Sequence, residues 1–390
     1  MNIETLTLEP GNPALINLIR AEIENRGPVS FSWFMQQALY HPEHGYYSSG
    51  RCGIGRRGDY FTNVSVGPLF GQLLAAQFAE IWERLGDTDN FVIVEQGAHH
   101  GDFARDVLEA ARKRYPDFFS ALRYRIIESF SVLQDRQLQT LQSFRDKVEW
   151  CDSIEPFVGI HFSNELLDAM PVRLIDPGGE KLVGFDGDRF VFVQGTAVSK
   201  PPREEGRANQ AALDWLDNVS RNLLRGYVLI VDYGYSRSEF RQTVQVRAKH
   251  RFLDSPFEQI GDADITAHVN WTSIAACAQK NGLRIAGFTD QHHFLTGIIS
   301  EWPELLQARS PDSTVRQPPS RRIRVGDADE RIKRALQTLL HPEMLGRSFQ
   351  VLALEKGIDF VAPLAGFKFA RAPRSTLGPD LNDEKTTHLG

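Results

Sequence analysis

The sequence is poor in cysteine, with only Cys52, Cys151 and Cys277 among 390 residues. Three widely separated cysteines argue against a disulfide framework and against a cysteine-based metal cluster. Long apolar runs are also missing: no stretch of about 18 apolar residues occurs, and the start, Met1 to Glu4, carries an acid where a secretory or mitochondrial signal needs basic residues. We therefore expect a soluble protein of the reducing cytoplasm, without membrane insertion.

An excess of positive charge is missing as well, because the net charge is −6. A negative chain gives no electrostatic reason to expect nucleic acid or an anionic membrane as partner, whereas a basic substrate is not repelled. The length and the 42% hydrophobic content suffice for one large domain, or two ordinary ones, with a full core.

Apolar residues at helical spacing mark the first part of the chain. They recur from Ala14 to Asn25, from Phe31 to Leu39 and from Val66 to Leu85. We assign residues 1–87 to an N-terminal helical segment, in which the Gly-, Ser- and Arg-rich stretch from Gly45 to Gly58 forms a loop.

Strands and helices then alternate over residues 88–356, as in an α/β fold with a doubly wound sheet. An Asp-Gly turn between two short strands, within Gly184 to Val193, predicts an inserted β-hairpin around residues 178–200. We expect a second insertion around residues 289–325. The polar residues 370–390 predict a disordered tail.

A strand followed by a carboxylate occurs twice. One apolar run ends at Glu95 and is followed by Gly97 and Gly101, and a second run, Tyr124 to Ile127, ends at Glu128. Glycine at the first turn lets the backbone approach a ligand closely. A carboxylate after the second strand can accept hydrogen bonds from both ribose hydroxyls. The expected ligand therefore contains adenosine.

The loop Gly97-Ala98-His99-His100-Gly101 indicates which adenosine compound binds. A dinucleotide site needs the spacing G-x-G-x-x-G, because a pyrophosphate sits on free N–H groups at a helix N-terminus. Here only two glycines are present, so S-adenosylmethionine, which has no phosphate, fits better. We expect its amino acid end near Glu95 and Gly97, its ribose on Glu128 and its adenine amine near Asp152. The alternative is a plain strand-to-helix turn, in which glycine is common.

Glu165 and Asp168 are the first catalytic candidates. They follow an apolar strand that includes Phe162, at the end of the sheet where ligands bind in open α/β folds. If a methyl group is transferred to an arginine, the acceptor that the family resemblance described below implies, the guanidinium pKa of about 13 or more requires a carboxylate that orients the group and takes its proton. The two carboxylates share a face if Glu165 begins a helix. The alternative is that both only complement the dipole of that helix.

Further candidates come from other segments. Asp59 and Asp232 are assigned to catalysis, and Asn164 to the cofactor. Asp232 ends a buried strand, where it either faces an active-site loop or simply caps the turn that follows. The pairs His99-His100 and His292-His293 lack Cys or acidic partners at ligand spacing, so no metal site is expected.

Several segments in a fixed order carry a family resemblance. They are Gly45-Tyr46-Tyr47, Gly58 to Thr62, Phe70-Gly71, Ser163 to Pro171, Val231 to Tyr235 and Ala263 to Val269. In that order they resemble the family of S-adenosylmethionine-dependent methyltransferases that includes the mitochondrial complex I assembly methyltransferase and its bacterial relatives. The resemblance runs from about residue 28 to residue 295.

This resemblance implies a class I methyltransferase (Rossmann-like) fold, S-adenosylmethionine as cofactor and a loop in the Gly45 to Gly58 region that covers it. It also implies that the partner is a protein substrate methylated on arginine, with a respiratory complex I subunit as the candidate.

The sequence departs from the family at two places. The family loop reads Gly-Pro-Gly-x-Gly, so His99 replaces the middle glycine, and Thr62 to Ser65 replaces Thr-Ser-Pro-Glu. The alternative function is therefore a binding or assembly protein that keeps the fold without turnover.

Overall fold

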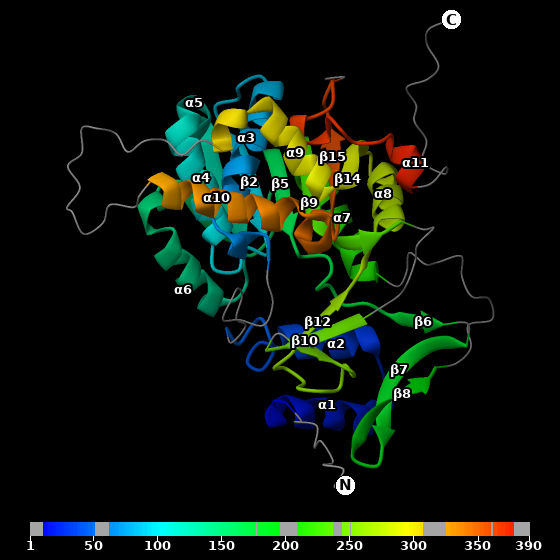
Figure 1. Cartoon of the computed structure of the whole chain (residues 1–390). Coiled ribbons are helices and arrows are strands. Elements are labelled where there is room, and N and C mark those ends of the chain that lie inside the picture. Colours follow the sequence, from blue (N-terminus) through cyan, green and yellow to red (C-terminus); the bar gives the residue numbers. More distant parts are fainter. Residues whose placement is uncertain are drawn as a thin grey trace, which may run out of the picture.

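The computed structural model describes residues 11–50, 62–176, 178–195, 209–236, 244–249, 251–306, 325–359 and 362–377. A large α/β unit lies above a smaller unit that contains the N-terminal helices and two small sheets (Figure 1). Among the helices that the structure describes, none is both long and apolar enough to cross a bilayer.

The helices and strands have the following bounds. The α-helices are α1 (Pro13–Arg26), α2 (Phe31–Tyr40), α3 (Leu69–Arg84), α4 (Asp102–Arg114), α5 (Pro116–Ala121), α6 (Ser131–Thr140), α7 (Gln210–Asn222), α8 (Trp271–Lys280), α9 (Gln291–Glu301), α10 (Val325–Leu340) and α11 (Pro373–Leu377). The strands of the large sheet are β2 (Phe91–Gln96), β3 (Leu122–Ile127), β4 (Val148–Cys151), β5 (Phe157–Asn164), β9 (Leu223–Tyr235), β13 (Val269–Asn270), β14 (Arg284–Asp290) and β15 (Phe349–Lys356). Those of the smaller unit are β1 (Val29–Ser30), β6 (Leu174–Asp176), β7 (Gly179–Asp186), β8 (Arg189–Gln194), β10 (Val244–Ala248), β11 (Arg251–Leu253) and β12 (Asp264–Ala267).

The large sheet has the strand order β14-β15-β9-β5-β2-β3-β4. Strands β4, β3, β2, β5 and β9 are parallel to one another, and β15 runs antiparallel to both β9 and β14. The predicted α/β doubly wound fold is confirmed. The final strand lies inside the sheet, between two strands that come earlier in the chain.

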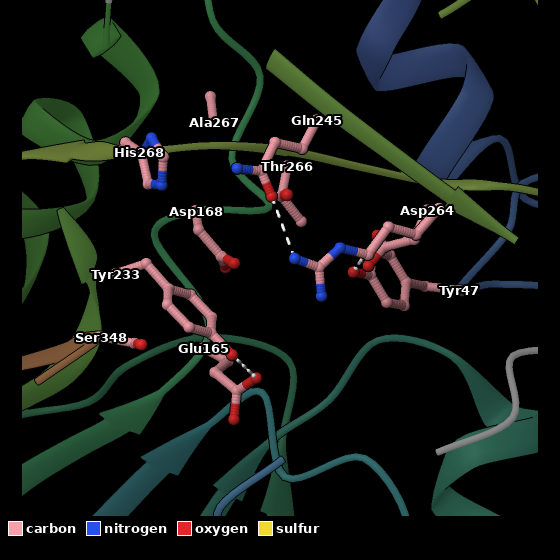
Figure 2. Close-up of a pocket in the computed structure, with 11 residues that line it drawn as sticks. Tyr47, Glu165, Asp168, Tyr233, Gln245, Asp264, Thr266, Ala267, His268 and Ser348 are labelled. Carbon is pink, nitrogen blue, oxygen red and sulfur yellow. Dashed lines mark hydrogen bonds between the residues drawn. The ribbon is translucent and has the colours of Figure 1, made fainter. Parts of the chain in front are cut away.

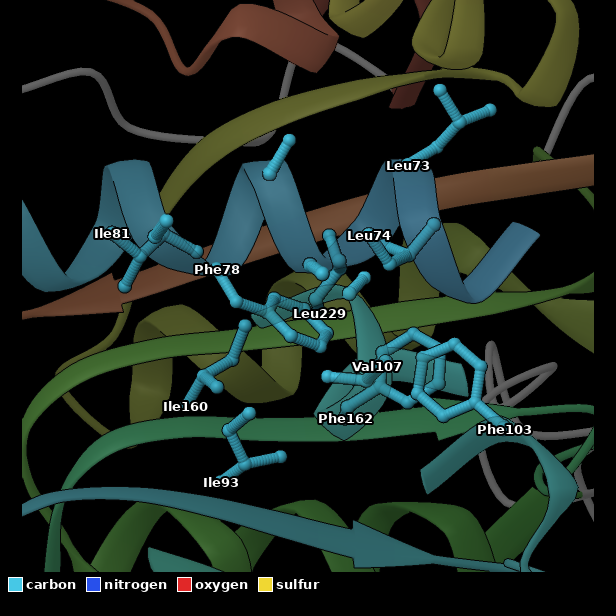
Figure 3. Packing of buried hydrophobic residues seen from close by; sticks show 14 of the residues in the cluster. Leu73, Leu74, Phe78, Ile81, Ile93, Phe103, Val107, Ile160, Phe162 and Leu229 are labelled. Atoms are coloured by element: carbon cyan, nitrogen blue, oxygen red, sulfur yellow. The ribbon is translucent and has the colours of Figure 1, made fainter. Parts of the chain in front are cut away.

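Helices cover both faces of this sheet. One buried cluster joins the sheet to α3, α4, α9 and α10, and a second joins its other face to α7, α8 and α11. Phe162 of β5 lies at the centre of the first cluster, 4.4 Å from Phe103 of α4 and 5.7 Å from Phe78 of α3 between ring centroids (Figure 3). The buried cluster therefore packs directly against β5, the strand that precedes Glu165.

The smaller unit has a core of its own, formed by α1 and α2 with side chains of the two small sheets. The inserted hairpin is present as β7 and β8, joined at Gly187, whose φ of 58° suits the tight turn. A second small sheet, β11-β10-β12, is not expected from the sequence. Both small sheets lie below the large sheet, on the side of α2 (Figure 1).

Several expected boundaries differ from the structure. Helix α3 packs on the large sheet, so residues 1–87 do not form a single helical segment. Helix α9, within the expected insertion 289–325, also packs on this sheet, while residues 307–324 lie outside the described residues. The expected tail 370–390 includes α11, whose Leu377 is fully buried; residues 378–390 lie outside the described residues.

Truncating Phe162 to alanine should destabilise the fold strongly. The side chain is 0% exposed, stacks on the Phe103 ring and meets the Phe78 ring edge-on. Truncating such a side chain leaves a cavity, which costs about 3–5 kcal/mol. Urea unfolding followed by circular dichroism measures the change. Phe369→Ala is the control, because Phe369 is 47% exposed and its loss should change stability by less than about 0.5 kcal/mol. Equal losses in the two variants would contradict this view of the core.

Candidate functional site

Two cavities lie at the carboxyl ends of the parallel strands, where open α/β sheets bind ligands. The large cavity has a volume of about 970 Å³ and the small cavity one of about 310 Å³. Glu165 and Tyr47 line both cavities. The two spaces therefore meet at these two side chains.

The turn after β2 forms one wall of the large cavity. Gly97, His99 and Gly101 have φ values of 82°, 47° and 81°, so all three adopt the left-handed backbone. This conformation costs a residue with a side chain roughly 1–2 kcal/mol. Gln137 helps to hold it by donating to the carbonyl oxygen of His99 at 2.9 Å. His99 thus preserves the backbone path that a glycine would take at the same place.

Two carboxylates predicted to bind the cofactor lie in the large cavity. Glu95 accepts a hydrogen bond from the Tyr124 hydroxyl at 2.6 Å, and burial raises the pKa of Glu95 to about 7. Glu128 accepts from the N–H of Phe130 at 3.0 Å and from Gln137 Nε2 at 3.2 Å, and burial raises its pKa as well. The Ser129 N–H is a third donor to this carboxylate, which still leaves it lone-pair capacity for a ligand hydroxyl.

The charges around the large cavity favour a cationic ligand. Its acids are Glu95, Asp102, Asp106, Glu128, Glu165 and Asp214. Arg105 lies on the same wall, but its guanidinium already binds Asp102 at 2.6 Å and Asp106 at 2.9 Å. A pyrophosphate would meet repulsion here. The positively charged sulfonium and ammonium groups of S-adenosylmethionine suit these acidic side chains.

The loop after β5 carries the catalytic candidates. Asn164 Nδ2 donates to Glu165 Oε1 at 2.9 Å, and its Oδ1 accepts from Asn63 Nδ2 at 2.9 Å. Asn164 lines the large cavity. Its hydrogen bond to Glu165 also orients that carboxylate. The condition that Glu165 begins a helix, on which both the shared helix face and the helix-dipole alternative depend, is not met: its φ is 54°, and the next element of the described chain is β6. Asp168 nevertheless faces the small cavity beside Glu165.

The geometry of this loop is set by Asp232 at the end of β9. Its Oδ2 accepts from the N–H groups of Leu166, Leu167 and Asp168 at 3.2, 2.8 and 3.3 Å, and its Oδ1 from the Tyr233 N–H at 2.7 Å. Burial raises the pKa of Asp232 to about 7, although these four donors oppose the shift. Asp232 is fully buried and lines neither cavity, so it lies behind the loop.

Carboxylates and tyrosines surround the small cavity. Figure 2 shows Tyr233 beside Glu165 and Tyr47 beside Asp264, with Asp168 between the two pairs. The Tyr47 hydroxyl donates to Asp264 Oδ1 at 2.7 Å, and the Tyr233 hydroxyl to Glu165 Oε2 at 3.4 Å. Tyr47, Tyr233 and Asp264 belong to the sequence segments that carry the family resemblance, but no role was predicted for them from the sequence.

Burial, together with repulsion from neighbouring carboxylates, raises the pKa values of Glu165 and Asp168. Burial raises the pKa of Glu165 to about 8, and the Asp232 charge adds to the shift. The pKa of Asp168 rises well above its ordinary value through burial and through the charges of Asp232, Glu165 and Asp264. A cation that enters the small cavity would stabilise the ionised forms.

Of the predicted site residues that the structure describes, Asp152, Asp232 and Gly101 line neither cavity. Asp152 follows β4 as expected but is exposed and lines neither cavity, so its contact with adenine stays a prediction. Asp59 lies outside the described residues. Of the turn glycines, Gly97 lines the large cavity, and Gly101 precedes α4, where an added Cβ would lie 3.2 Å from Leu141 Cδ1.

Comparison with known proteins gives consistent matches. Residues 73–289 match the family model for S-adenosyl-L-methionine-dependent methyltransferases. The chain is 27% identical to a "Protein arginine methyltransferase NDUFAF7 homolog, mitochondrial" of Drosophila melanogaster, over 90% of this chain and 86% of that protein. It is 23% identical to "Protein arginine methyltransferase NDUFAF7, mitochondrial" of Homo sapiens, over 88% and 84%.

A crystal structure from Burkholderia thailandensis with S-adenosyl-homocysteine bound is similar in both sequence and fold. It is 28% identical, with a TM-score of 0.80 over 95% of this chain and 100% of that chain. A native crystal structure from the same organism has a TM-score of 0.78 at 28% identity.

The relatives correct one expectation from the sequence. Cysteine content and the first residues predicted a cytoplasmic protein, whereas these curated relatives are named as mitochondrial proteins. The cytoplasmic location is therefore contradicted.

The raised pKa of Glu165 predicts how stability depends on pH. Because this pKa is about 8 rather than 4.5, the folded protein retains a proton that the unfolded chain releases, and the free energy of unfolding falls as pH rises between these values. Glu165→Gln should flatten that fall. Since Glu165 lines two open cavities, we discount the full shift for screening by solvent and expect a difference on the order of 2 kcal/mol between about pH 5 and pH 8.5.

Urea unfolding of wild type and variant at both pH values measures this effect. Glu43→Gln is the control, because the Glu43 side chain is 80% exposed. Parallel pH profiles for wild type and Glu165→Gln would show that Glu165 ionises in the folded protein as it does in water.

Proposed function

The chain belongs to the family of S-adenosyl-L-methionine-dependent methyltransferases, and we propose that its acceptor is an arginine side chain of a protein held in the small cavity. The observation that carries this proposal is the shared wall: Glu165 and Tyr47 line both cavities. A donor in the large cavity and an acceptor in the small cavity would meet there.

The cofactor is S-adenosylmethionine, as the family and the S-adenosyl-homocysteine in the Burkholderia structure indicate. We propose that Glu128 accepts both ribose hydroxyls and that Glu95 and Gly97 receive the amino acid end. When bound, the cofactor supplies an electrophilic methyl group on a sulfonium. The left-handed turn at His99 keeps the backbone clear of this ligand, since the loop follows the path that glycine would give.

The small cavity suits a guanidinium acceptor. A guanidinium is planar, carries five N–H donors and holds its charge in proteins. The carboxylates of Glu165, Asp168 and Asp264 offer acceptors for these donors. Because the neutral nucleophile is scarce, a carboxylate has to orient the guanidinium and take its proton during transfer. We assign that task to Glu165, with Asp168 as the second acceptor.

The names of the relatives support a protein substrate. Both NDUFAF7 proteins are named protein arginine methyltransferases. We propose that the substrate of this chain is also a protein, and that a subunit of respiratory complex I is the first candidate, as the sequence resemblance implies. A binding or assembly protein without turnover is the competing proposal, and the prediction for Glu165 and Asp168 separates the two.

Replacing Glu128 by alanine should weaken cofactor binding at least about tenfold. Two charge-assisted hydrogen bonds to the ribose are lost, each of which contributes about 1.5–3 kcal/mol. Calorimetry with S-adenosylhomocysteine measures the dissociation constant. The control is Glu149→Ala, whose side chain is 53% exposed on the edge strand β4. An unchanged constant for Glu128→Ala would rule out the ribose assignment.

Glu165→Gln and Asp168→Asn should lower the rate of methyl transfer while cofactor binding stays near normal. Loss of a general base costs roughly 10²–10⁴ in rate, and the amides keep the size of the side chains. Single-turnover transfer to an arginine-containing protein substrate tests this, with melting curves on the same variants. The control is Asp188→Asn, because the Asp188 side chain is fully exposed. A loss of melting temperature without a rate defect would mean that these carboxylates serve folding only.

A further inference from the structure

Strands β10 and β12 present one row of side chains to the small cavity. Gln245 pairs with Thr266 and Arg247 pairs with Asp264 in antiparallel register. Directly paired residues lie on the same face of a sheet, and alternate residues along a strand share that face. All four of these residues line the small cavity, and the intervening Val246 is buried in the core of the smaller unit.

Arg247 thus places a cation in a cavity that carries three carboxylates. Its Nη2 donates to Gln245 Oε1 at 3.1 Å, and its guanidinium carbon lies 4.4 Å from the centroid of the Phe252 ring. The Arg247 charge also helps to lower the pKa of His268, another residue of the cavity wall. The guanidinium is therefore electrostatically part of this site.

The anchoring of Arg247 is nevertheless loose. Its Nε is buried and has no hydrogen-bond partner among the described residues. Within the part of the chain that the structure describes, Arg247 forms no ion pair, whereas Arg105 in the large cavity is held by two aspartates. A guanidinium held by one neutral acceptor and one aromatic ring can be moved at a smaller cost than one held by carboxylates.

We propose that Arg247 is an internal substitute for the acceptor's guanidinium, which balances the carboxylates of the small cavity when no acceptor is bound and has to be displaced when one enters. This proposal rests on the arginine acceptor of the proposed function. Burying carboxylates without a cation is unfavourable, so a resident cation stabilises the empty site. The same cation repels an incoming cationic side chain. Only an acceptor whose other contacts outweigh this repulsion can therefore bind.

Phe252, which the Arg247 guanidinium already contacts, extends into solvent. It is 67% exposed on β11, directly opposite Arg247 in the β10–β11 pairing. An arginine can stack on the outer part of such a ring while its charge returns to water. Displacement therefore needs a change of side-chain rotamer and no rearrangement of the sheet.

The test measures binding of one small acceptor, Nα-acetyl-arginine methylamide, to the full chain saturated with S-adenosylhomocysteine. We expect Arg247→Gln to bind this probe more tightly than wild type, on the order of tenfold, because a like charge has been removed from the cavity. Arg247→Lys keeps the charge and should bind as weakly as wild type. Arg251→Gln is the matched control, since Arg251 is exposed and lies on the opposite face of the same hairpin.

The neutral citrulline analogue of the probe should show no difference between wild type and Arg247→Gln. Equal binding of the arginine probe to these two proteins would overturn the role of Arg247 and leave the arginine acceptor standing. Absence of binding to every variant, with S-adenosylhomocysteine still bound, would instead overturn the arginine acceptor. Methylation of Arg247 itself, seen as a mass increase in its peptide, would also overturn the proposal, because the side chain would then be a substrate.

Discussion

The carboxylate of Asp232 joins the two strands on which the site is built. It ends β9, and it collects the N–H groups of three successive residues in the loop after β5. Hydrogen bonds to a buried carboxylate are stronger than those between neutral groups. They bend the loop away from a helical path and place Glu165 and Asp168 at the small cavity. The positions of both candidate catalytic carboxylates therefore depend on a residue that lines neither cavity.

Selectivity for cations is the second property that follows from this arrangement. Acids outnumber the cationic side chains around both cavities, and the pKa values of Glu95, Glu165 and Asp168 are raised. Protein sites usually avoid such crowding, because each buried charge loses hydration. Here the crowding suits two positively charged ligands, a sulfonium on one side of Glu165 and a guanidinium on the other.

The sequence predicts those parts of the site that the order of strands determines. Glu95, Gly97 and Glu128 follow strands whose apolar runs are unmistakable, so their places in the large cavity could be found without coordinates. Whether a helix begins at Glu165 could not be decided from the sequence, because the path of this loop depends on hydrogen bonds to Asp232, which lies in a distant segment of the chain. The small cavity was missed for the same reason: residues as far apart as Tyr47 and Asp264 meet there only after folding. The prediction of a cytoplasmic location was wrong for a different reason: amino-acid composition reflects the chemistry of the chain and does not determine the compartment to which it is delivered.

The interior position of β15 has a consequence for biosynthesis. Strands β9 and β14 are completed early, but the strand that joins them ends at Lys356, more than a hundred residues after β9. At about 5–20 residues per second, a ribosome needs roughly 6–24 s to make that interval. During this time the backbone edge of β9 that later pairs with β15, including Ile230 and Val231, has no hydrogen-bond partner strand. A nascent chain of this protein therefore exposes an unpaired strand edge that can pair with other chains. We expect chaperones that cover such edges to bind it until β15 has been made.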